Sequence, residues 1–351
     1  MAILLRAPQS HADFFFWRSK PAPETQPPIS PANPSTKKQS TTSSEKPKTP
    51  QKTSRPAPTK PSLRSLPEED RNRNVQLQVF LDRNLFSPKS IDGHSGSSTL
   101  KALNAYLAAN EQSPVSDEKQ FTLPEHSPRH STFTLETKHL QFISTQGNTR
   151  HSIPYSSITE FICERFHCSE ELLSTLNPTR KLNSIVPGDE ITVPDVEPFE
   201  LETIQPTAAT PENEALRDRE IHVDLANRSL KVTHQSKTLA AFPIAIGSPG
   251  LPTPKGKWRI TGICLLPTYR WDQGVLNRGV RTNNFKMMPP GPNNPVGVVW
   301  CGLNKLGLGI HGTNQPDSIG TASSHGCIRL ANWDAIRLTA LVNSGTPVFT
   351  E

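Results

Sequence analysis

Apolar residues recur at helical spacing in two runs near the start of the patterned part of the chain. The runs consist of Val75, Leu77, Phe80 and Leu81, and of Leu100, Leu103, Tyr106 and Leu107. Intervals of three and four residues place side chains on one face of a helix. Turn sequences at 87–88 (Ser-Pro) and 92–93 (Asp-Gly) separate the two runs. The pattern predicts a small α-helical domain over residues 66–112.

A second patterned segment extends over residues 140–195. Its apolar spacing predicts one amphipathic helix at 158–166 and another around 172–176. A short strand is predicted at 191–193, after the turn sequence Pro-Gly-Asp. We therefore expect a second small domain, in which two helices precede a strand.

From residue 219 onward the apolar period changes to two. The alternating residues are Ile221, Val223 and Leu225, then Leu230 and Val232. The turn at Asn227-Arg228 joins these runs into a predicted β-hairpin. Further strands are predicted at 242–246, 258–260 and 296–300. One helix is predicted after them, with Asn332 as its N-cap and its end near Gly345. Residues 219–351 are therefore predicted to form a β-rich domain with one covering helix.

The segments between these domains have the composition of linkers. Residues 21–65 are rich in Pro, Ser, Thr and Lys and have no apolar period, which is typical of a disordered, extended linker. Residues 113–139 are polar and irregular, and residues 196–218 are acidic and rich in proline. Both are expected to be linkers, and the whole chain is expected to be multidomain.

The charge of the chain is concentrated in this first linker. Residues 1–65 contain 11 Lys and Arg against 3 Asp and Glu, a net charge of +8. The whole chain carries +6, so the remainder carries −2. Nucleic-acid binding usually requires a basic face on a folded domain, so we expect no nucleic-acid partner. The basic segment is interpreted as a solvated linker, or alternatively as a segment attracted to an anionic membrane or wall polymer.

Residues 1–20 contain two short apolar patches that charged residues interrupt. Neither patch approaches the roughly 20 apolar residues that span a bilayer, and no clear signal peptide is present. We interpret this segment as the remnant of a membrane anchor or signal. Our hypothesis is that the true start lies upstream of Met1.

The five cysteines are Cys163, Cys168, Cys264, Cys301 and Cys327. No CxxC pair is present, and the spacing of the first two is unusual for zinc, so no metal site is expected there. Four of the cysteines are interpreted as structural thiols. Cys327 differs because it follows Ser324-His325-Gly326 and lies sixteen residues after His311.

Cys327 is the candidate nucleophile of the last domain. A thiol needs a base or a positive charge nearby to react at neutral pH. Both His311 and His325 are candidates for this base, and His311 is favoured because Gly326 indicates a bend between His325 and the thiol. His325 is then expected to shape the pocket or contact the substrate.

Two further features accompany this cysteine. The N–H groups of Gly326 and Cys327 are candidates for an oxyanion hole, because glycine lets the backbone approach a ligand closely. Arg329 is a candidate for binding a substrate carboxylate in bidentate fashion. Its alternative role is an ordinary surface or ion-pairing arginine.

The two upstream domains resemble known wall-binding families. Residues 66–112 resemble the peptidoglycan-binding helical domain through Leu77, Gln78, Leu81, Ile91, Asp92, Gly93, Gly96, Thr99, Ala102 and Leu103. Residues 140–195 resemble the βααβ LysM domain, which binds N-acetylglucosamine polymers. The likeness lies in the Asn177-Pro178 and Val186-to-Pro194 part. The usual start is replaced by residues 154–159, which puts glycan binding in question more than the fold.

The last domain resembles the L,D-transpeptidase catalytic domain in four ordered motifs. These are the opening hairpin at 221–232, the Thr-Pro-x-Gly-x-Trp-x-Ile segment at 253–260, the Pro-Gly-Pro-x-Asn-Pro-x-Gly loop at 290–297, and the stretch His311-Gly-Thr to Ser-Ser-His-Gly-Cys-Ile-Arg329. The resemblance implies a β-rich, sandwich-like fold and acyl transfer in peptidoglycan through a cysteine thioester. It implies no cofactor.

The resemblance also assigns residues. Cys327 is implied as nucleophile and His311 as base, with the Gly312 carbonyl orienting the imidazole. Ser324 occupies the family's Ser/Thr position and is expected, with His325 and Arg329, to bind the substrate; Arg329 stands where asparagine is frequent. The implied reaction joins two stem peptides by a 3→3 cross-link and releases D-Ala.

Alternatives remain open. Water as acceptor would give an L,D-carboxypeptidase, and a lipoprotein amine would give a tethering transpeptidase. A non-catalytic wall-binding protein and a zinc protein that uses Cys327, His311 and His325 are further alternatives. The expected partners are stem peptides, glycan strands and, in the tethering case, an outer-membrane lipoprotein. The expected location is the periplasm or cell envelope with an N-terminal membrane anchor, and the oligomeric state is left open.

Overall fold

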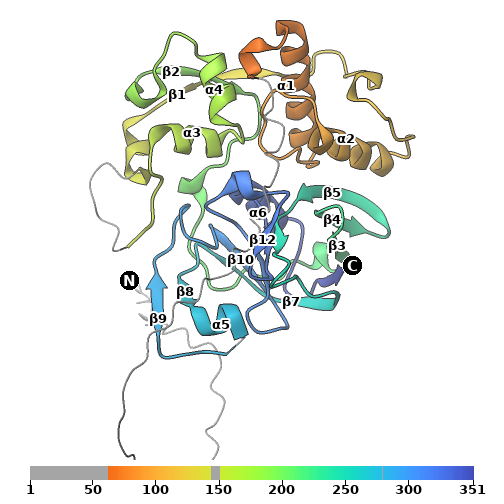
Figure 1. Ribbon diagram of the computed structural model, residues 1–351, viewed down its shortest axis with the longest axis vertical. Coiled ribbons are helices and arrows are strands. Elements are labelled where there is room, and N and C mark those ends of the chain that lie inside the picture. The colour runs from red at the N-terminus through yellow and green to blue at the C-terminus, as the bar shows by residue number, and fades with distance from the viewer. Residues whose placement is uncertain (1–61, 144–150, 279) are drawn as a thin grey trace, which may run out of the picture. The chain divides into compact units, whose positions relative to one another are not determined.

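The computed structural model describes residues 62–143, 151–278 and 280–351 (Figure 1). The interpretations of residues 1–20 and of nearly all of 21–65 therefore lie outside the described part of the chain. The described residues belong to one compact unit, Pro61–Glu351. Within them, every helix is too short or too polar to cross a bilayer.

Two helices, α1 (Glu68–Arg83) and α2 (Ser97–Ala109), confirm the helical pair that the apolar spacing predicts. Their facing side chains include the fully buried Leu77, Leu81 and Leu103. The connection is held by Gln78, whose buried amide accepts from the N–H of Gly93 at 2.8 Å and donates to the carboxylate of Asp92 at 2.8 Å. The apolar face therefore pairs the helices, and one buried amide fixes the turn between them.

The next part of the chain has a βααβ arrangement. Its first strand lies within residues 113–139, where a linker is expected. The strands β1 (His130–Thr134) and β2 (Glu190–Pro194) pair antiparallel, and α3 (Ile158–Arg165) and α4 (Glu170–Leu176) lie between them in sequence. Both helices are capped by serine, at Ser157 and Ser169. The linker prediction for residues 113–139 is wrong for β1 and for the turn η2 (Glu118–Gln120).

Eight strands form the sheet of the last part of the chain, in the order β13-β11-β10-β7-β14-β3-β4-β5. Their bounds are β3 Arg219–Asp224, β4 Ser229–His234, β5 Lys237–Pro243, β7 Gly256–Leu265, β10 Val299–Leu303, β11 Gly309–His311, β13 Ile328–Arg329 and β14 Pro347–Thr350. The β3–β4 hairpin confirms the period-two prediction. Two pairs, β11 with β13 and β14 with β3, run parallel.

Shorter elements complete the fold. Two small pairings lie outside the sheet, β6 with β12 and β8 with β9. The remaining bounds are β6 Ile246–Gly247, β8 Tyr269–Asp272, β9 Phe285–Met288, β12 Ala322–Ser324, α5 Gln273–Arg278, α6 Asn332–Thr339, η1 Leu63–Ser65, η3 Thr137–Phe142, η4 Leu182–Ser184, η5 Leu201–Thr203, η6 Glu214–Leu216 and η7 Pro316–Ser318.

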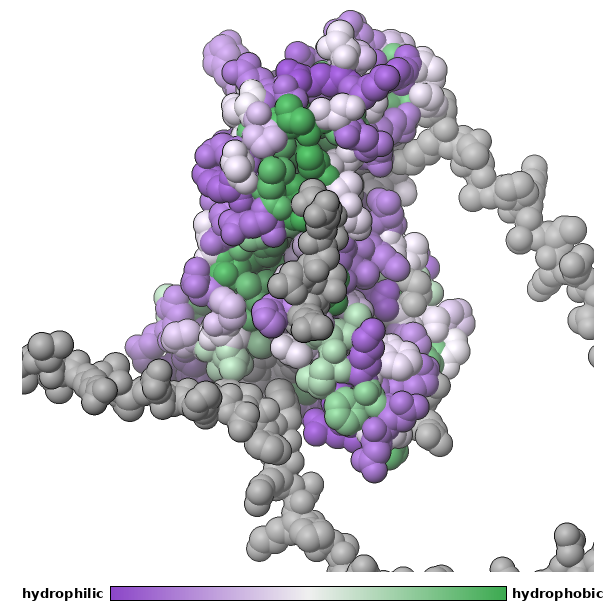
Figure 2. Space-filling model, turned by 90° about the vertical axis from the view of Figure 1, so that its left-hand side faces the viewer, coloured by the Kyte–Doolittle hydropathy of each residue, from purple (hydrophilic) through white to green (hydrophobic). Residues whose placement is uncertain are grey.

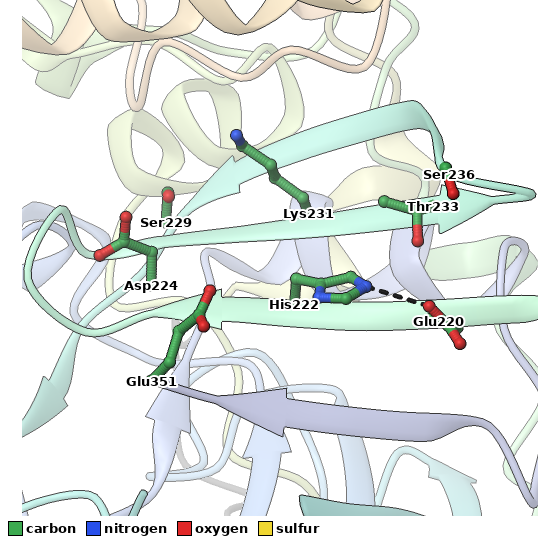
Figure 3. Close-up of a pocket in the computed structure, with 8 residues that line it drawn as sticks. All are labelled: Glu220, His222, Asp224, Ser229, Lys231, Thr233, Ser236 and Glu351. Atoms are coloured by element: carbon green, nitrogen blue, oxygen red, sulfur yellow. Dashed lines mark hydrogen bonds and ion pairs between the residues drawn. The ribbon is translucent and has the colours of Figure 1, made fainter. Parts of the chain in front are cut away.

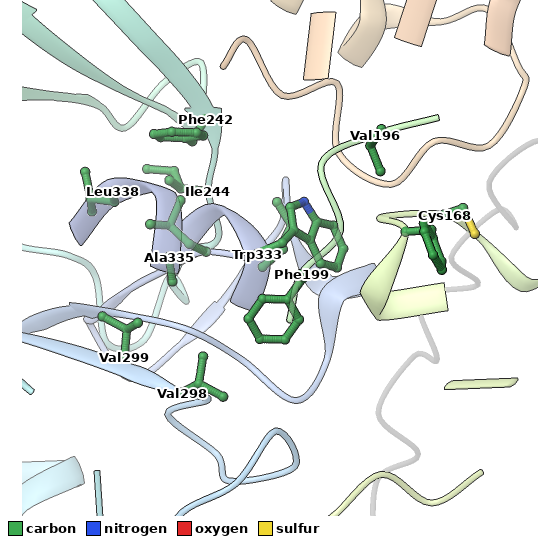
Figure 4. Close-up of a cluster of buried hydrophobic side chains, with 14 of the residues drawn as sticks. Cys168, Val196, Phe199, Phe242, Ile244, Val298, Val299, Trp333, Ala335 and Leu338 are labelled. Atoms are coloured by element: carbon green, nitrogen blue, oxygen red, sulfur yellow. The ribbon is translucent and has the colours of Figure 1, made fainter. Parts of the chain in front are cut away.

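Helix α6 is the covering helix that the sequence predicts, with different ends. It begins at Asn332 after Ala331, which is the N-cap residue and makes no side-chain cap bond, and it ends at Thr339 rather than near Gly345. Trp333, Ala335 and Leu338 pack into the main apolar core, where Figure 4 shows Phe199 beside Trp333. Asn332 is therefore not a cap, and its buried side chain serves another purpose.

The segment 196–218 packs onto the sheet instead of acting as a free linker. Val196, Phe199 and Leu201 are buried in the main core. The N–H of Leu265 donates to Thr207 at 2.9 Å, and Thr207 donates back to Leu265 at 3.2 Å.

Figure 2 shows that polar and apolar side chains share one face of the molecule, with the larger apolar area in its upper half.

Candidate active site

Cys327 lies in the short connection between β12 and β13. The preceding Gly326 has φ of +109°, a backbone conformation that side-chain-bearing residues rarely adopt. A Cβ on Gly326 would meet only ordinary contacts, at 3.7 Å or more. The positive φ at position 326 therefore requires glycine. This backbone angle turns the chain so that Cys327 lies directly before β13.

The side chain of Ser324 stabilises this turn through two hydrogen bonds. Its buried hydroxyl donates to the carbonyl of Cys327 at 2.6 Å and accepts from the N–H of Gly326 at 3.2 Å. The Gly326 N–H, which is expected to face an oxyanion, is thus occupied in this structure. The N–H of Cys327 is the remaining candidate of the expected pair.

His311 ends β11, the strand next to β13. The parallel register places Ile310 opposite Ile328 and His311 opposite Arg329. Gly309 is therefore the residue alongside Cys327. The structure places the favoured histidine at the end of β11 and the cysteine directly before the neighbouring strand, β13, sixteen residues later in sequence.

The imidazole of His311 is fixed on two sides. Its Nδ1 lies 2.6 Å from the carbonyl oxygen of Gly312, so Nδ1 carries the proton and donates to that oxygen. Its ring stacks on Trp300 with centroids 5.4 Å apart and an interplanar angle of 23°. The other nitrogen, Nε2, is left with the lone pair that a base needs.

Burial sets the charge state of both groups. It lowers the pKa of His311 to about 4, and the Arg329 guanidinium adds to this effect. It raises the pKa of the Cys327 thiol to about 11, against the opposing effects of the Gly309 backbone and Arg329. The thiol donates to the Gly307 carbonyl at 3.2 Å. At neutral pH the pair therefore rests as a neutral thiol and a neutral imidazole.

Arg329 and Tyr269 complete the surroundings of the thiol. Burial lowers the pKa of Arg329, while Cys327 and Tyr269 favour its charge. The Nε atom of Arg329 is buried without a hydrogen-bond partner in the described part of the chain. Tyr269 belongs to β8, and burial together with Cys327 raises its pKa to about 12. The sequence analysis missed Tyr269, because no motif marks it.

His325, the other candidate base, is exposed. In residues 62–143, 151–278 and 280–351, no group of three His, Cys, Asp or Glu side chains is placed to hold a metal ion. All five cysteines are free, with Cys168 and Cys301 buried.

A hollow of about 370 Å³ lies elsewhere, on the outer side of β3 and β4 (Figure 3). Its lining is polar and contains His222, which lies 3.2 Å from Glu220. None of the candidate catalytic residues lines it. This hollow is therefore separate from Cys327 and His311.

Comparisons with known proteins identify the family of this part of the chain. A family described as the L,D-transpeptidase catalytic domain matches residues 218–349. YkuD of Bacillus licheniformis, which bears the name of an L,D-transpeptidase, is 30% identical over 189 residues, 54% of this chain and 90% of that protein. ErfK/SrfK of Escherichia coli, with a name of the same kind, is 37% identical over 119 residues, 32% of this chain and 37% of that protein.

Solved structures give a weaker match. The catalytic domain of the Enterococcus faecium L,D-transpeptidase is 24% identical, with a TM-score of 0.30, and covers 38% of this chain and 98% of that domain. The Mycobacterium tuberculosis L,D-transpeptidase 3 is 16% identical, with a TM-score of 0.32, and covers 48% of this chain and 76% of that one.

Proposed function

Since this chain belongs to the L,D-transpeptidase family of enzymes, we propose that it forms 3→3 cross-links between peptidoglycan stem peptides through a thioester on Cys327. The observation that carries the proposal is the 2.6 Å bond from His311 Nδ1 to the Gly312 carbonyl. It leaves Nε2 unprotonated on the strand next to the thiol. Membership of the L,D-transpeptidase family supports peptidoglycan stem peptides as the substrate class.

The first half-reaction is acylation. His311 Nε2 takes the thiol proton as the Cys327 sulfur attacks the carbonyl of the L-centre of the donor's diamino acid. The bond to D-Ala breaks, and the leaving amine takes the proton from His311. A neutral resting pair suits this step, because the charges form only as the sulfur attacks.

The second half-reaction transfers the acyl group. The side-chain amine of an acceptor stem attacks the thioester, gives a proton to His311, and forms the new amide bond. The sulfur leaves as thiolate and recovers the proton. Water in place of the amine would release a tripeptide, the carboxypeptidase outcome, and a lipoprotein amine would give the tethering outcome.

Arg329 is the proposed site for the donor's terminal carboxylate. Its unpartnered, buried Nε offers a donor next to the thiol, and a carboxylate would satisfy it. The Cys327 N–H is the proposed oxyanion donor. The exposed His325 is proposed to contact the substrate, whereas Ser324 acts through the turn that it holds.

The upstream parts are proposed to bind the wall. The βααβ unit supports a LysM-like assignment, now with β1 as its first strand. The 189-residue match to the Bacillus protein is longer than the 218–349 family segment, so the likeness includes residues outside the catalytic part. The α1–α2 unit is proposed as a peptidoglycan-binding helical domain. Together they would raise the local concentration of substrate in the cell envelope.

The test is product analysis with the full chain and a disaccharide-tetrapeptide. The proposal predicts release of D-Ala and appearance of a cross-linked dimer, both abolished in Cys327→Ala. Tripeptide without dimer would make the chain a carboxypeptidase. If neither D-Ala nor dimer were produced by the intact chain, the transpeptidase proposal would be wrong.

A further inference from the structure

Asn332, at the first position of α6, has a fully buried side chain that joins three segments. Its Oδ1 accepts from the N–H of Val298 at 3.1 Å. Its Nδ2 donates to the carbonyl of Pro292 at 3.2 Å and to Glu164 Oε1 at 2.7 Å. A buried amide with every bond satisfied fixes its partners in place.

The Oδ1 atom of Asn332 also lies against two glycines. A Cβ on Gly297, or one on Gly312, would collide with it. Gly297 has φ of +61°, and the Gly312 N–H donates to Val299 at 3.2 Å. The Asn332 amide is therefore packed directly against the peptide whose carbonyl holds His311.

The third partner of Asn332 comes from a distant part of the chain. Glu164 belongs to α3 of the βααβ unit, 168 residues earlier. Burial raises its pKa to about 8, although hydrogen bonds from Tyr155 and Asn332 oppose the rise. The carboxyl is thus neutral at pH 7, which removes the cost of burying a charge there.

The same unit makes a second contact with the loop before β10. The N–H of Ile153 donates to Pro290 at 2.7 Å, and the N–H of Asn293 donates to Ile153 at 3.2 Å. Gly291 has φ of +135°, and a Cβ there would collide with the Ile153 backbone. The 290–298 segment is therefore held by backbone pairing with Ile153 and by the Asn332 amide, which in turn donates to Glu164.

From these contacts we propose that Glu164 is a positioning residue for the catalytic base. Through Asn332 it fixes the Gly312 peptide, whose carbonyl accepts the hydrogen bond from His311 Nδ1 and so holds the imidazole in place. The βααβ unit is then part of the catalytic apparatus in addition to any role in wall binding. This inference rests on the assignment of His311 and Cys327 as the reacting pair.

The test measures alkylation of Cys327 by iodoacetamide across pH, followed on the Cys327 peptide by mass spectrometry in the full chain. This readout needs no peptidoglycan substrate. The variants are Glu164→Leu, which removes the acceptor, and Glu164→Gln, which keeps it. Phe161→Leu is the packing control: Phe161 belongs to the same helix, α3, and its side chain is buried in the apolar core. His311→Ala gives the rate without a base.

The proposal predicts that Glu164→Leu slows alkylation about 10- to 100-fold, the range in which a small misplacement of a catalytic group reduces rates. Glu164→Gln should stay within about twofold of the unmodified chain, and so should Phe161→Leu. If Glu164→Leu does not fold, Glu164→Asp takes its place, and its rate of Cys327 alkylation is expected to fall about tenfold.

Three results would overturn the inference, and they can be told apart. Equal rates for Glu164→Leu and Phe161→Leu, with His311→Ala slow, would show that Glu164 does not position the base. An unchanged rate in His311→Ala would show that His311 is not the base, which removes both the proposed mechanism and this inference. Loss of the rate in Glu164→Gln as well would also contradict it, since that variant keeps the acceptor.

Discussion

His311 Nδ1 lies 2.6 Å from the carbonyl oxygen of Gly312, the next residue in the chain. A carbonyl can only accept, so the bond selects the tautomer with hydrogen on Nδ1. The bond also prevents rotation of the ring. The tautomer and orientation of His311 are therefore set by the backbone of a glycine that has Asn332 packed against it.

The low pKa of His311 predicts the pH dependence of acylation. Burial lowers that pKa to about 4, so the imidazole stays neutral, and able to accept a proton, above this value. The acylation rate in single turnovers should be flat through the neutral range and fall as pH drops through about 4. Loss of the rate near the ordinary histidine value of 6.5 would contradict the role of burial.

Arg329 should bind the terminal carboxylate of the donor. Arg329→Ala is expected to lower kcat/KM for a tetrapeptide about 10- to 100-fold, as removal of a charge-assisted hydrogen bond does. A tetrapeptide with a C-terminal amide is the matched control, because it has no carboxylate to lose. An equal effect of Arg329→Ala on both substrates would argue against this contact.

Gly326→Ala should disturb the turn before the nucleophile. An alanine at φ +109° is strained and is expected to cost about 1–2 kcal/mol of unfolding free energy. Denaturant unfolding and Cys327 alkylation should both show the loss. Gly250→Ala is the control, since a Cβ there meets open space and its φ is not positive. Equal stability of the two variants would contradict the strain argument.

Ser324→Ala should leave two backbone groups unpaired. The Cys327 carbonyl would lose its donor and the Gly326 N–H its acceptor. We expect a loss of about 1–3 kcal/mol in unfolding free energy and slower acylation. Ser318→Ala removes a comparable hydroxyl bond, to Gln315 at 2.6 Å, in an exposed turn. The loss of unfolding free energy in Ser318→Ala should be smaller than in Ser324→Ala. A larger loss in Ser318→Ala would contradict the role of the buried Ser324 hydroxyl.

Two buried carboxyls predict that stability falls as pH rises. Burial raises the pKa of Glu164 to about 8 and that of Asp334 to about 7, while both ionise near their ordinary values when unfolded. Between those values each of these two carboxyls binds more protons in the native chain than in the unfolded chain, so its contribution to the free energy of unfolding decreases with pH. Buried histidines such as His311, whose pKa is lowered to about 4, contribute the opposite slope below their unfolded value of 6.5. Thermal unfolding between about pH 7 and pH 8 should therefore show the carboxyl slope, and Glu164→Gln should reduce it. A slope unchanged in Glu164→Gln would show that Glu164 does not hold its proton.

Local patterns in the sequence predicted the elements that local forces determine. The α1–α2 pair follows from apolar spacing, and the β3–β4 hairpin follows from alternation around Asn227-Arg228. The preference for His311 over His325 rests on Gly326, which indicates a bend between His325 and the thiol, and it stays a prediction. The parallel pairing of β11, which ends at His311, with β13, which directly follows Cys327, is consistent with that choice.

Long-range contacts explain what the sequence did not show. Strand β1 is polar and partly exposed, and its partner β2 lies about sixty residues later, so no apolar period marked it. Asn332 has the residue type of a helix cap, yet its side chain is used by Val298, Pro292 and Glu164. Tyr269 reaches the thiol from a separate strand pair. Each of these three features depends on contacts with residues far away in sequence, which local patterns do not reveal.

The central claim is that Cys327 carries the acyl group, and the most direct measurement is the intact mass of the full chain mixed with a disaccharide-tetrapeptide. The account predicts a covalent adduct equal to the donor minus D-Ala, which maps to the Cys327 peptide and is absent from Cys327→Ala. D-Ala release without an adduct on Cys327, or the same adduct in Cys327→Ala, would contradict it.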